Sequence, residues 1–300
     1  MPGQRYDIRD RVVLVTGAAR GIGAAVARDL YARGARVALV GLEPDELEAL
    51  AAQLGDRAIW IEADVSDRDA IEAAAARTIE RFGGIDVVIA NAGIALGGSV
   101  LAVDPDAFDR LIDVNLLGVW RTVRACLPSI VERRGYVLVV SSAAAIAHAP
   151  GMSAYNTAKA GVEAFGDTLR SEMRSRGVGV GVAYFSWLDT DMVRGADERP
   201  ALRRARTSLG PAGRTYPLSD AVTAVAEGIE RRSPVVVVPG YLKVMLALRG
   251  VLTPIIGRLA AQRYPQFGAL VDEEAARFAA EGSAAVGPGG AAGMSTPAGR

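Results

Sequence analysis

The chain has 300 residues, with 34 basic and 34 acidic side chains and a formal net charge of zero. Half of the residues are apolar and 23% are charged, which excludes a disordered chain. The zero net charge argues against a nucleic-acid-binding protein. One cysteine, Cys126, excludes an internal disulfide and a cysteine-based metal cage. One histidine, His148, leaves no His-rich metal site and disfavours a His-based triad, so we expect no metal.

The N-terminal residues 1–11 are polar and charged, and they lack the apolar stretch of a secretory signal. No run of about 18 apolar residues occurs, so an ordinary membrane-spanning helix is not expected. These two observations predict a cytoplasmic protein.

Over residues 1–240, short apolar runs alternate with longer stretches that have helical spacing. The runs are apolar throughout, as in parallel strands buried on both faces. The expected strands are 11–15, 36–40, 58–61, 86–90, 136–140, 178–184 and 234–238, and the expected helices are 22–33, 44–54, 68–81, 106–131, 153–176 and 219–231. This alternation predicts one α/β domain over 1–240, a doubly wound parallel sheet of about seven strands with helices on both faces.

Three segments interrupt the alternation. Residues 191–217 are rich in Arg, Gly and Pro, and we expect a mobile, irregular substrate lid there rather than a second domain. Residues 241–280 form an apolar C-terminal extension, in which Pro254 and two glycines argue against one long straight helix. Residues 281–300 lack periodicity and are expected to be a disordered tail.

A glycine-rich turn joins the first strand to the first helix, with the sequence Thr16-Gly17-Ala18-Ala19-Arg20-Gly21-Ile22-Gly23. Backbone N–H groups at such a helix start favour an anion, and glycines let a pyrophosphate approach the backbone closely. Because the turn follows a strand and opens a helix, it favours a nucleotide site over an ordinary β–α turn.

Tyr155 and Lys159 lie four residues apart, and therefore on one helix face. The chain has only one other lysine, Lys243, which makes this pairing informative. A phenol is a poor acid or base at neutral pH, and a neighbouring ammonium lowers its pKa. Ser142 follows the strand 136–140 and Asn115 lies in the helix 106–131, near the sheet edge where open α/β folds build their sites.

These residues together resemble the short-chain dehydrogenase/reductase family over roughly residues 8–240. The family's glycine motif is matched by Thr16 to Gly23, its Asn-Ala-Gly by Asn91, Ala92 and Gly93, and its adenine-holding Asp-Val pair by Asp64 and Val65. Its catalytic tetrad is matched by Asn115, Ser142, Tyr155 and Lys159. The resemblance implies a Rossmann-like fold and a nicotinamide cofactor that carries the hydride chemistry.

The resemblance also implies a role for each tetrad residue. Tyr155 would exchange a proton with the substrate oxygen as general acid/base. Lys159 would lower the pKa of Tyr155 and hydrogen-bond the nicotinamide ribose. Ser142 would orient and polarise the substrate oxygen, and Asn115 would position a water that relays protons to Lys159.

One stretch departs from the family pattern. After the sixth strand the family has Pro-Gly, three further residues and Thr, whereas this chain has Phe185, Ser186, Trp187, Leu188 and Asp189 before Thr190. Thr190 is retained and is expected to contact the cofactor carboxamide. The two replaced residues put the local backbone and the nicotinamide pocket wall in doubt.

The choice between NAD and NADP rests on the end of the second strand. An acid there binds the ribose hydroxyls and favours NAD, whereas an arginine favours NADP. The usual deciding position holds Leu42, which does neither. Glu43 could take the acidic role and Arg20 could pair with a 2′-phosphate, and the distance of Glu43 from the glycines favours NAD.

Several residues have simpler interpretations. His148 is expected to border the pocket as a spectator, and Cys126 to be a small core residue. The lid arginines Arg199, Arg203, Arg204 and Arg206 could attract an anionic substrate, but we expect them to form a solvated face. The stretch 242–259, flanked by cations, could cover the pocket or a subunit interface, or could lie on a membrane surface.

The sequence therefore predicts an NAD(P)-dependent oxidoreductase that interconverts a secondary alcohol and a ketone, on an apolar substrate. The resemblance to the family also implies a homodimer or homotetramer, because the helices 106–131 and 153–176 are similar to those that pair between subunits in the family. Two alternatives remain at this point. One is a peripheral membrane dehydrogenase for lipid, steroid or retinoid-like alcohols. The other is a catalytically silent dinucleotide sensor on the same fold, because fold alone does not establish catalysis.

Overall fold

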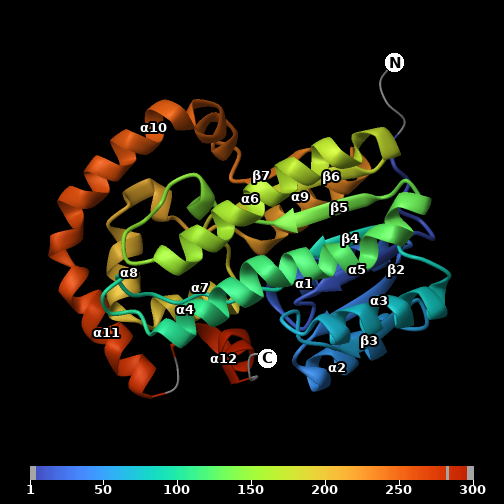
Figure 1. Ribbon diagram of the computed structural model, residues 1–300, viewed down its shortest axis with the longest axis horizontal. Coiled ribbons are helices and arrows are strands. Elements are labelled where there is room, and N and C mark those ends of the chain that lie inside the picture. Colours follow the sequence, from blue (N-terminus) through green and yellow to red (C-terminus); the bar gives the residue numbers. More distant parts are fainter. Residues whose placement is uncertain (1–4, 282–283, 296–300) are drawn as a thin grey trace.

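A computed structural model describes residues 5–281 and 284–295 of the chain (Figure 1). Seven parallel strands form one sheet in the order β3-β2-β1-β4-β5-β6-β7, as the sequence predicts. The strands are β1 (Val12–Thr16), β2 (Arg36–Gly41), β3 (Ala58–Glu62), β4 (Val87–Ala90), β5 (Tyr136–Val140), β6 (Gly179–Phe185) and β7 (Val235–Val238). Strand β1 lies between β2 and β4, so the strand order reverses at β1, where open α/β sheets place their ligands.

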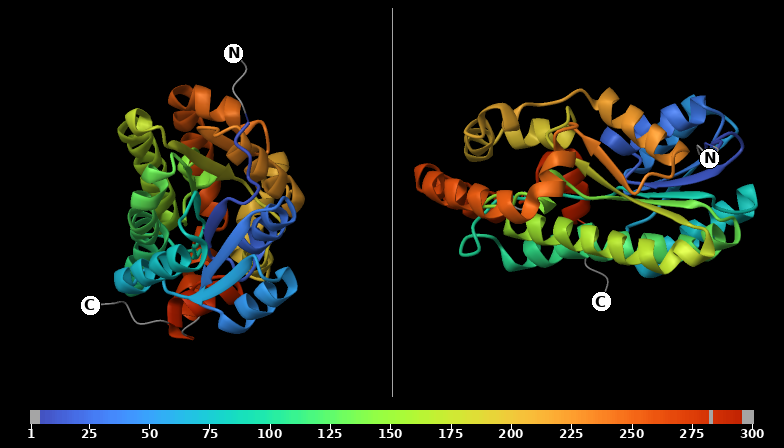
Figure 2. Two further views of the ribbon diagram at one scale, coloured as in Figure 1. Left: turned by 90° about the vertical axis from the view of Figure 1, so that its right-hand side faces the viewer. Right: turned by 90° about the horizontal axis from the view of Figure 1, so that it is seen from above.

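Helices cover both faces of the sheet (Figure 2). One apolar core lies between the sheet and α1 (Gly21–Ala32), α2 (Pro44–Leu54) and α9 (Leu218–Glu230). The other lies between the sheet and α3 (Arg68–Phe82), α4 (Pro105–Ile112), α5 (Gly118–Glu132) and α6 (Ser153–Met173). Cys126 is fully buried in this second core, which confirms the prediction for that residue.

The expected single helix over 106–131 is wrong in one respect. The helices α4 and α5 are separated by a π-helical turn at Asp113–Leu117. Such turns insert one extra residue into the helical ladder and occur often at functional sites. Asn115 lies in this turn and is fully buried.

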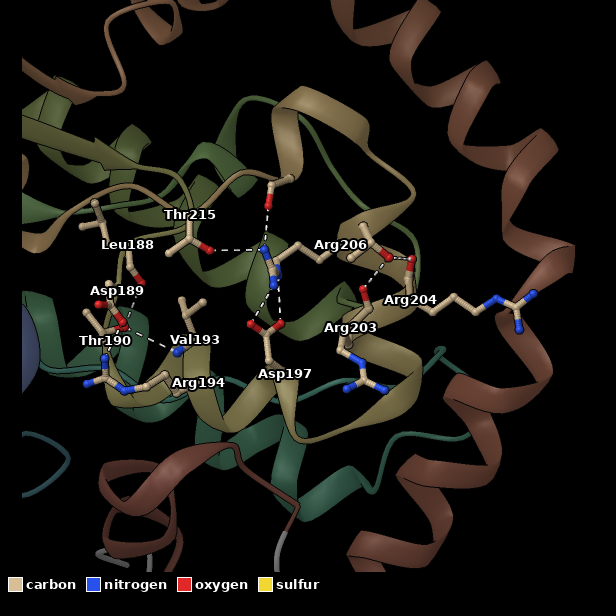
Figure 3. Close-up of polar contacts among 12 residues, drawn as sticks. Leu188, Asp189, Thr190, Val193, Arg194, Asp197, Arg203, Arg204, Arg206 and Thr215 are labelled. Atoms are coloured by element: carbon tan, nitrogen blue, oxygen red, sulfur yellow. Dashed lines mark hydrogen bonds and ion pairs between the residues drawn. The ribbon is translucent and has the colours of Figure 1, made fainter.

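The segment 191–217, which we expected to be an irregular lid and for which we keep the name lid, is helical. It contains α7 (Asp191–Asp197), α8 (Pro200–Thr207) and a 3₁₀ turn at Gly210–Gly213. Arg206 donates to Asp197 from Nε at 2.9 Å and from Nη2 at 2.6 Å, so an ion pair locks α8 onto α7 (Figure 3). Arg203 and Arg204 are exposed as predicted and point away from this pair (Figure 3).

The interpretation of Arg199 and Arg206 as solvated side chains is wrong. Arg199 is 7% exposed, and its guanidinium donates to the backbone carbonyls of Ala284 and Ala285 at 2.8 and 2.6 Å. Arg206 is held by Asp197 and by the carbonyl of Gly213. Both arginines donate to backbone or carboxylate oxygens, which explains why Arg199 can be buried and Arg206 can be largely shielded from solvent.

The C-terminal extension forms one long helix, α10 (Leu242–Arg263), followed by α11 (Gly268–Ala280). Pro254 lies inside this helix without ending it, and the helix is not straight (Figure 1), which agrees with the expectation. Figure 1 shows that α10 curves as an arch beside the lid, and proline within a helix is a recognised cause of bending. By length and composition alone, the segment Leu242–Gln266 could cross a membrane, which corrects the expectation that no such helix exists.

The predicted disordered tail is also wrong where the structure describes it. Residues 287–295 form α12 (Gly287–Ser295), which lies beneath α7 and contacts it (Figure 1). Ala285 and Val286 are buried, and Val286 N donates to the carbonyl of Ala95 at 2.9 Å. Residues 282–283 and 296–300 lie outside the described residues.

Candidate active site

The glycine-rich turn is packed so closely that a side chain could not be added. A Cβ on Gly23 would lie 2.2 Å from the carbonyl oxygen of Gly17. Thr16 and Asn91 tie this turn to β4: Thr16 Oγ1 accepts from the N–H groups of Asn91 and Ala92 at 3.1 and 3.2 Å, and Asn91 Nδ2 donates to the Thr16 carbonyl at 3.0 Å. The turn therefore presents bare backbone over the switch point of the sheet, as a pyrophosphate requires.

A cavity of about 580 Å³ lies above this turn and extends to the lid and to α10. Its lining includes most of the residues predicted from the sequence: Gly17, Arg20, Gly21, Ile22, Glu43, Asp64, Val65, Asn91, Ala92, Gly93, Ser142, Tyr155, Lys159 and Thr190. Thr16, Gly23 and Asn115 lie behind the wall and support it. The bare glycine turn, in one cavity with Glu43 and Asp64 at one part of the lining and Tyr155 and Lys159 at another, fits a dinucleotide.

Tyr155 and Lys159 lie in the first turns of α6, and both line the cavity together with Ser142, which follows β5. Lys159 is 4% exposed, and its Nζ donates to the carbonyl of Val140 at 3.0 Å. Burial lowers the pKa of Lys159 to about 8. Ser142 Oγ accepts from the N–H of Ala144 at 3.2 Å, which orients the hydroxyl at the cavity wall.

Burial raises the pKa of Tyr155, and a hydrogen bond with Ser142 opposes this rise without cancelling it. The ammonium of Lys159 lies 5.7 Å from the centre of the Tyr155 ring. The pKa is raised because a phenolate is poorly solvated in this buried position. That Lys159 lowers the pKa of Tyr155 stays a prediction.

Asn115 uses its whole amide to hold the loop after β4. Its Oδ1 accepts from the N–H of Ile94 and its Nδ2 donates to the carbonyl of Ile94, both at 2.8 Å. A Cβ on the neighbouring Gly93 would lie 3.2 Å from Asn115 Oδ1 and 3.6 Å from Lys159 Nζ. Asn115 thus closes the space behind Lys159 and keeps the loop from shifting.

The two residues considered for cofactor choice contact each other. Arg20 Nε donates to Glu43 Oε1 at 2.9 Å and to Oε2 at 3.0 Å. Two further carboxylates lie near the same guanidinium, with Asp191 at 3.6 Å and Glu46 at 3.9 Å. Three acids therefore surround one cation, and the local charge at this end of the cavity is negative.

Asp64 forms an ion pair with Arg110, a residue that the sequence motifs do not indicate. Arg110 Nη2 donates to Asp64 Oδ2 at 2.6 Å, and the N–H and hydroxyl of Ser66 donate to Oδ1, each at 2.8 Å. Burial raises the pKa of Asp64, but the hydrogen bonds from Arg110 and Ser66 outweigh it and hold the pKa below its usual value. Arg110 Nε also donates to the carbonyl of Gly293 in α12 at 2.7 Å.

In the stretch 185–190, which departs from the family pattern, Thr190 still lies at the cavity. This residue caps α7 by accepting from the N–H of Val193 at 3.4 Å and lines the cavity (Figure 3). Phe185, Ser186 and Trp187 also line the cavity, and Ser186 N pairs with the carbonyl of Val238 at 2.9 Å. His148 borders the cavity, as predicted, and is exposed.

Comparison with known proteins agrees with this geometry. Residues 11–201 match the short chain dehydrogenase family. The 3-oxoacyl-(acyl-carrier-protein) reductase of Haemophilus influenzae is 32% identical over 221 residues, which cover 73% of this chain and 90% of that protein. Nodulation protein G of a Rhizobium species (strain N33) is 34% identical over 188 residues, which cover 62% of this chain and 77% of that protein.

Among solved structures, a 3-ketoacyl-(acyl-carrier-protein) reductase from Brucella melitensis, complexed with NADH, is 26% identical with a TM-score of 0.69, covering 77% of this chain and 97% of that one. A short-chain dehydrogenase/reductase from Burkholderia phymatum, in complex with NAD, has a TM-score of 0.73 at 23% identity, covering 82% and 95% of the two chains. The identity to the Burkholderia phymatum protein is so low that this similarity shows a shared fold and nothing more. The family match over 11–201, on a sheet and glycine turn of this form, shows that the chain belongs to the short-chain dehydrogenase/reductase family of NAD(P)-dependent oxidoreductases.

Proposed function

We propose that this enzyme interconverts an apolar secondary alcohol and a ketone, with NAD as the preferred cofactor. The observation that carries the proposal is the convergence of Tyr155, Ser142 and Lys159 in one cavity with the bare glycine turn. All four tetrad side chains are present, which does not favour a catalytically silent dinucleotide sensor.

In this proposal, bound nicotinamide supplies the hydride chemistry and the protein manages the proton. Tyr155 removes the proton from the substrate hydroxyl during oxidation and returns it to the carbonyl oxygen during reduction. The Ser142 hydroxyl hydrogen-bonds the same substrate oxygen and holds it against Tyr155. Lys159, fixed through Nζ to the Val140 carbonyl, supplies a nearby positive charge when protonated and so favours the phenolate.

The lining of the cavity beyond the tetrad supports an apolar substrate. It is formed by side chains from the lid, α10 and the start of α11, together with Trp187. The lid contributes Leu202 and Leu209, α10 contributes Met245 and Ile256, and the start of α11 contributes Phe267 and Val271. A mainly apolar lining with a few polar groups at one end is typical of a small-molecule site in which polar groups set the orientation.

The charge around Arg20 supports NAD. A 2′-phosphate would have to approach Arg20 past Glu43, Glu46 and Asp191, whereas ribose hydroxyls can donate to Glu43. We expect NADH to bind more tightly than NADPH in fluorescence titrations, and Glu43→Ala to reduce this preference by about tenfold, which corresponds to ~1.4 kcal/mol.

Glu48→Ala serves as the matched control, because Glu48 lies exposed on the same helix, α2. It should leave the preference unchanged. Tighter binding of NADPH that is lost in Arg20→Ala would contradict the assignment of NAD. Failure to bind either dinucleotide would contradict the proposed function itself.

The position of α12 supports a role as the outer wall of the adenosine pocket. Gly289, Gly290, Ala292 and Gly293 line the cavity opposite the glycine turn. A Cβ on Gly289 would lie 3.5 Å from Arg20 Cδ, and Gly293 is held by Arg110, which also holds Asp64. The helix thus bridges the two sides of the cleft that receive the adenosine in this proposal.

Displacing α12 is expected to weaken NADH binding. A Cβ on Gly293 would lie 2.7 Å from Ile94 Cγ2, so Gly293→Val should push the helix off the cleft. We expect the Kd for NADH to rise about tenfold or more, equal to ~1.4 kcal/mol of lost contact. Gly257→Val, with nothing within 4 Å of the added Cβ, is the control. A Kd that falls in Gly293→Val would indicate that α12 obstructs the cofactor instead.

The subunit arrangement remains a proposal. Leu117 and Trp120, at the junction of the π turn and α5, are 42% and 38% exposed, although both are large and apolar. They lie on one of the helices expected to pair between subunits, which supports a homo-oligomer that buries them. A monomer in light scattering at micromolar concentration would contradict it.

A further inference from the structure

The outer face of α10 carries a continuous apolar stripe. Its members are spaced three or four residues apart, as on one side of a helix: Val244, Leu248, Val251, Ile255 and Leu259, which are 59%, 51%, 67%, 48% and 48% exposed. Over an 18-residue window in Leu242–Gln266 the mean hydropathy is 1.5, and none of that window is buried. A soluble protein rarely leaves so long an apolar face uncovered unless it meets a partner.

The inner face of the same helix belongs to the active site. Leu242, Met245, Ile256 and Ala260 line the cavity that holds Tyr155. One helix therefore separates the apolar part of the catalytic cavity from the exposed stripe, and it curves along one end of the molecule (Figure 1).

The helix is fastened at its two ends and in its middle. Arg249 pairs with Glu163 of α6, and Thr253 Oγ1 donates to the carbonyl of Ile146 at 3.2 Å. Leu242 is 1% exposed at the end of β7, while Phe267 and Val271, beyond the helix, pack with Ala201 of α8. A helix held in this way cannot cross a bilayer without breaking these contacts, although its length would allow it.

The charged residues of α10 indicate what kind of surface could cover the apolar stripe. The helix has four cations and no Asp or Glu. Lys243 and Arg258 are exposed, and neither has an ion-pair partner within residues 5–281 and 284–295. Two copies of α10 packed on each other would bring these cations together without a compensating acid, which is unfavourable. An anionic lipid bilayer fits both features, because its acyl region can receive the apolar stripe and its negative head groups can pair with the cations.

We propose that α10 lies in the plane of an anionic lipid bilayer and that the enzyme takes its alcohol or ketone from that bilayer. The inference rests on the proposed function and specifies its substrate class: a secondary alcohol or ketone that partitions into lipid. The stripe enters the acyl boundary, Lys243 and Arg258 meet the head groups, and the inner face of α10 guides the substrate into the cavity.

The test uses the full chain and vesicles of phosphatidylcholine, alone or with phosphatidylglycerol. Co-sedimentation should be strong only with phosphatidylglycerol and should weaken as salt rises, because salt screens the head groups. The double variant Leu248→Glu/Val251→Glu should lose vesicle binding at least about tenfold, given the cost of inserting two carboxylates. The control, Ile79→Glu, alters an apolar residue of α3 that is 38% exposed and should bind as the wild type does.

Activity separates this inference from the proposed function. Neither Leu248 nor Val251 lines the cavity, so the double variant should oxidise a short, water-soluble secondary alcohol at the wild-type rate. Its kcat/KM for a long-chain alcohol supplied in vesicles should fall about tenfold or more, with the binding. Absence of vesicle binding, with NAD-linked activity intact, would overturn the membrane inference alone. A wild-type dimer that the double variant dissociates would overturn it too, since a second copy would then cover the stripe.

Discussion

Replacing Tyr155 with phenylalanine is expected to lower kcat by about 10²–10⁴-fold, the range typical of losing a positioned general acid/base. The change removes one hydroxyl and keeps the ring that packs in the cavity wall. The hydroxyl also takes part in the hydrogen bond with Ser142, so the substrate oxygen loses its proton-transfer partner and Ser142 loses one of the groups that orient it. The measurement is steady-state oxidation of a secondary alcohol at saturating NAD.

Binding measurements decide whether that loss is catalytic. The Kd for NADH should stay near the wild-type value, because the tyrosine hydroxyl contributes to proton transfer rather than to the adenosine site. Tyr241→Phe is the matched control, since Tyr241 is a second tyrosine that lines the same cavity. It should leave kcat close to that of the wild type. Full activity in Tyr155→Phe would remove this residue from the mechanism.

Replacing Arg110 with methionine is expected to lower the free energy of unfolding by about 3–5 kcal/mol, because it leaves a buried carboxylate without its cation. Arg110 and Asp64 are 6% and 7% exposed. The variant also strips the carbonyl of Gly293 of its donor, so α12 loses one of its anchors. Urea unfolding followed by fluorescence gives the difference.

Two further variants test the cause of that loss. Asp64→Asn in the Arg110→Met background removes the unpaired charge and should restore part of the stability. Arg194→Met removes an arginine whose side chain and whose partner Asp189 are each 58% exposed, and should cost less than about 1 kcal/mol. If both variants lost the same free energy of unfolding, the buried pair would contribute no more to stability than the exposed pair does.

The same pair should govern the acid stability of the protein. In the folded state the pKa of Asp64 lies below its value in the unfolded chain, which is ~4. Its contribution is therefore complete above that unfolded value and is lost as the pH falls through the lower, folded pKa. In Arg110→Met this part of the pH dependence should shrink, because the main hydrogen bond that lowers the pKa is gone.

Much of the fold and the centre of the site follow from local sequence. Continuous apolar runs such as Tyr136–Val140 can be satisfied only between two layers of helices, so they predict a parallel sheet. The spacing of Tyr155 and Lys159 places both on one face of whatever helix forms there. The glycine turn lies between a strand and a helix, so the sequence predicts that a phosphate group can approach its backbone closely. Each of these inferences depends on residues within a few positions of one another.

The tertiary structure decided what depends on residues far apart in the chain. The pairing of Arg20 with Glu43, the burial of Arg110 between Asp64 and Gly293, and the docking of α12 join segments with no shared local pattern. The glycine-rich sequence of residues 284–295 predicts disorder, because these residues have little intrinsic helix propensity. The segment is held in place by hydrogen bonds from Arg199 and Arg110 and to the loop after β4. Likewise, the composition of α10 shows that it is apolar, but only the fold shows which face lines the cavity and which remains exposed.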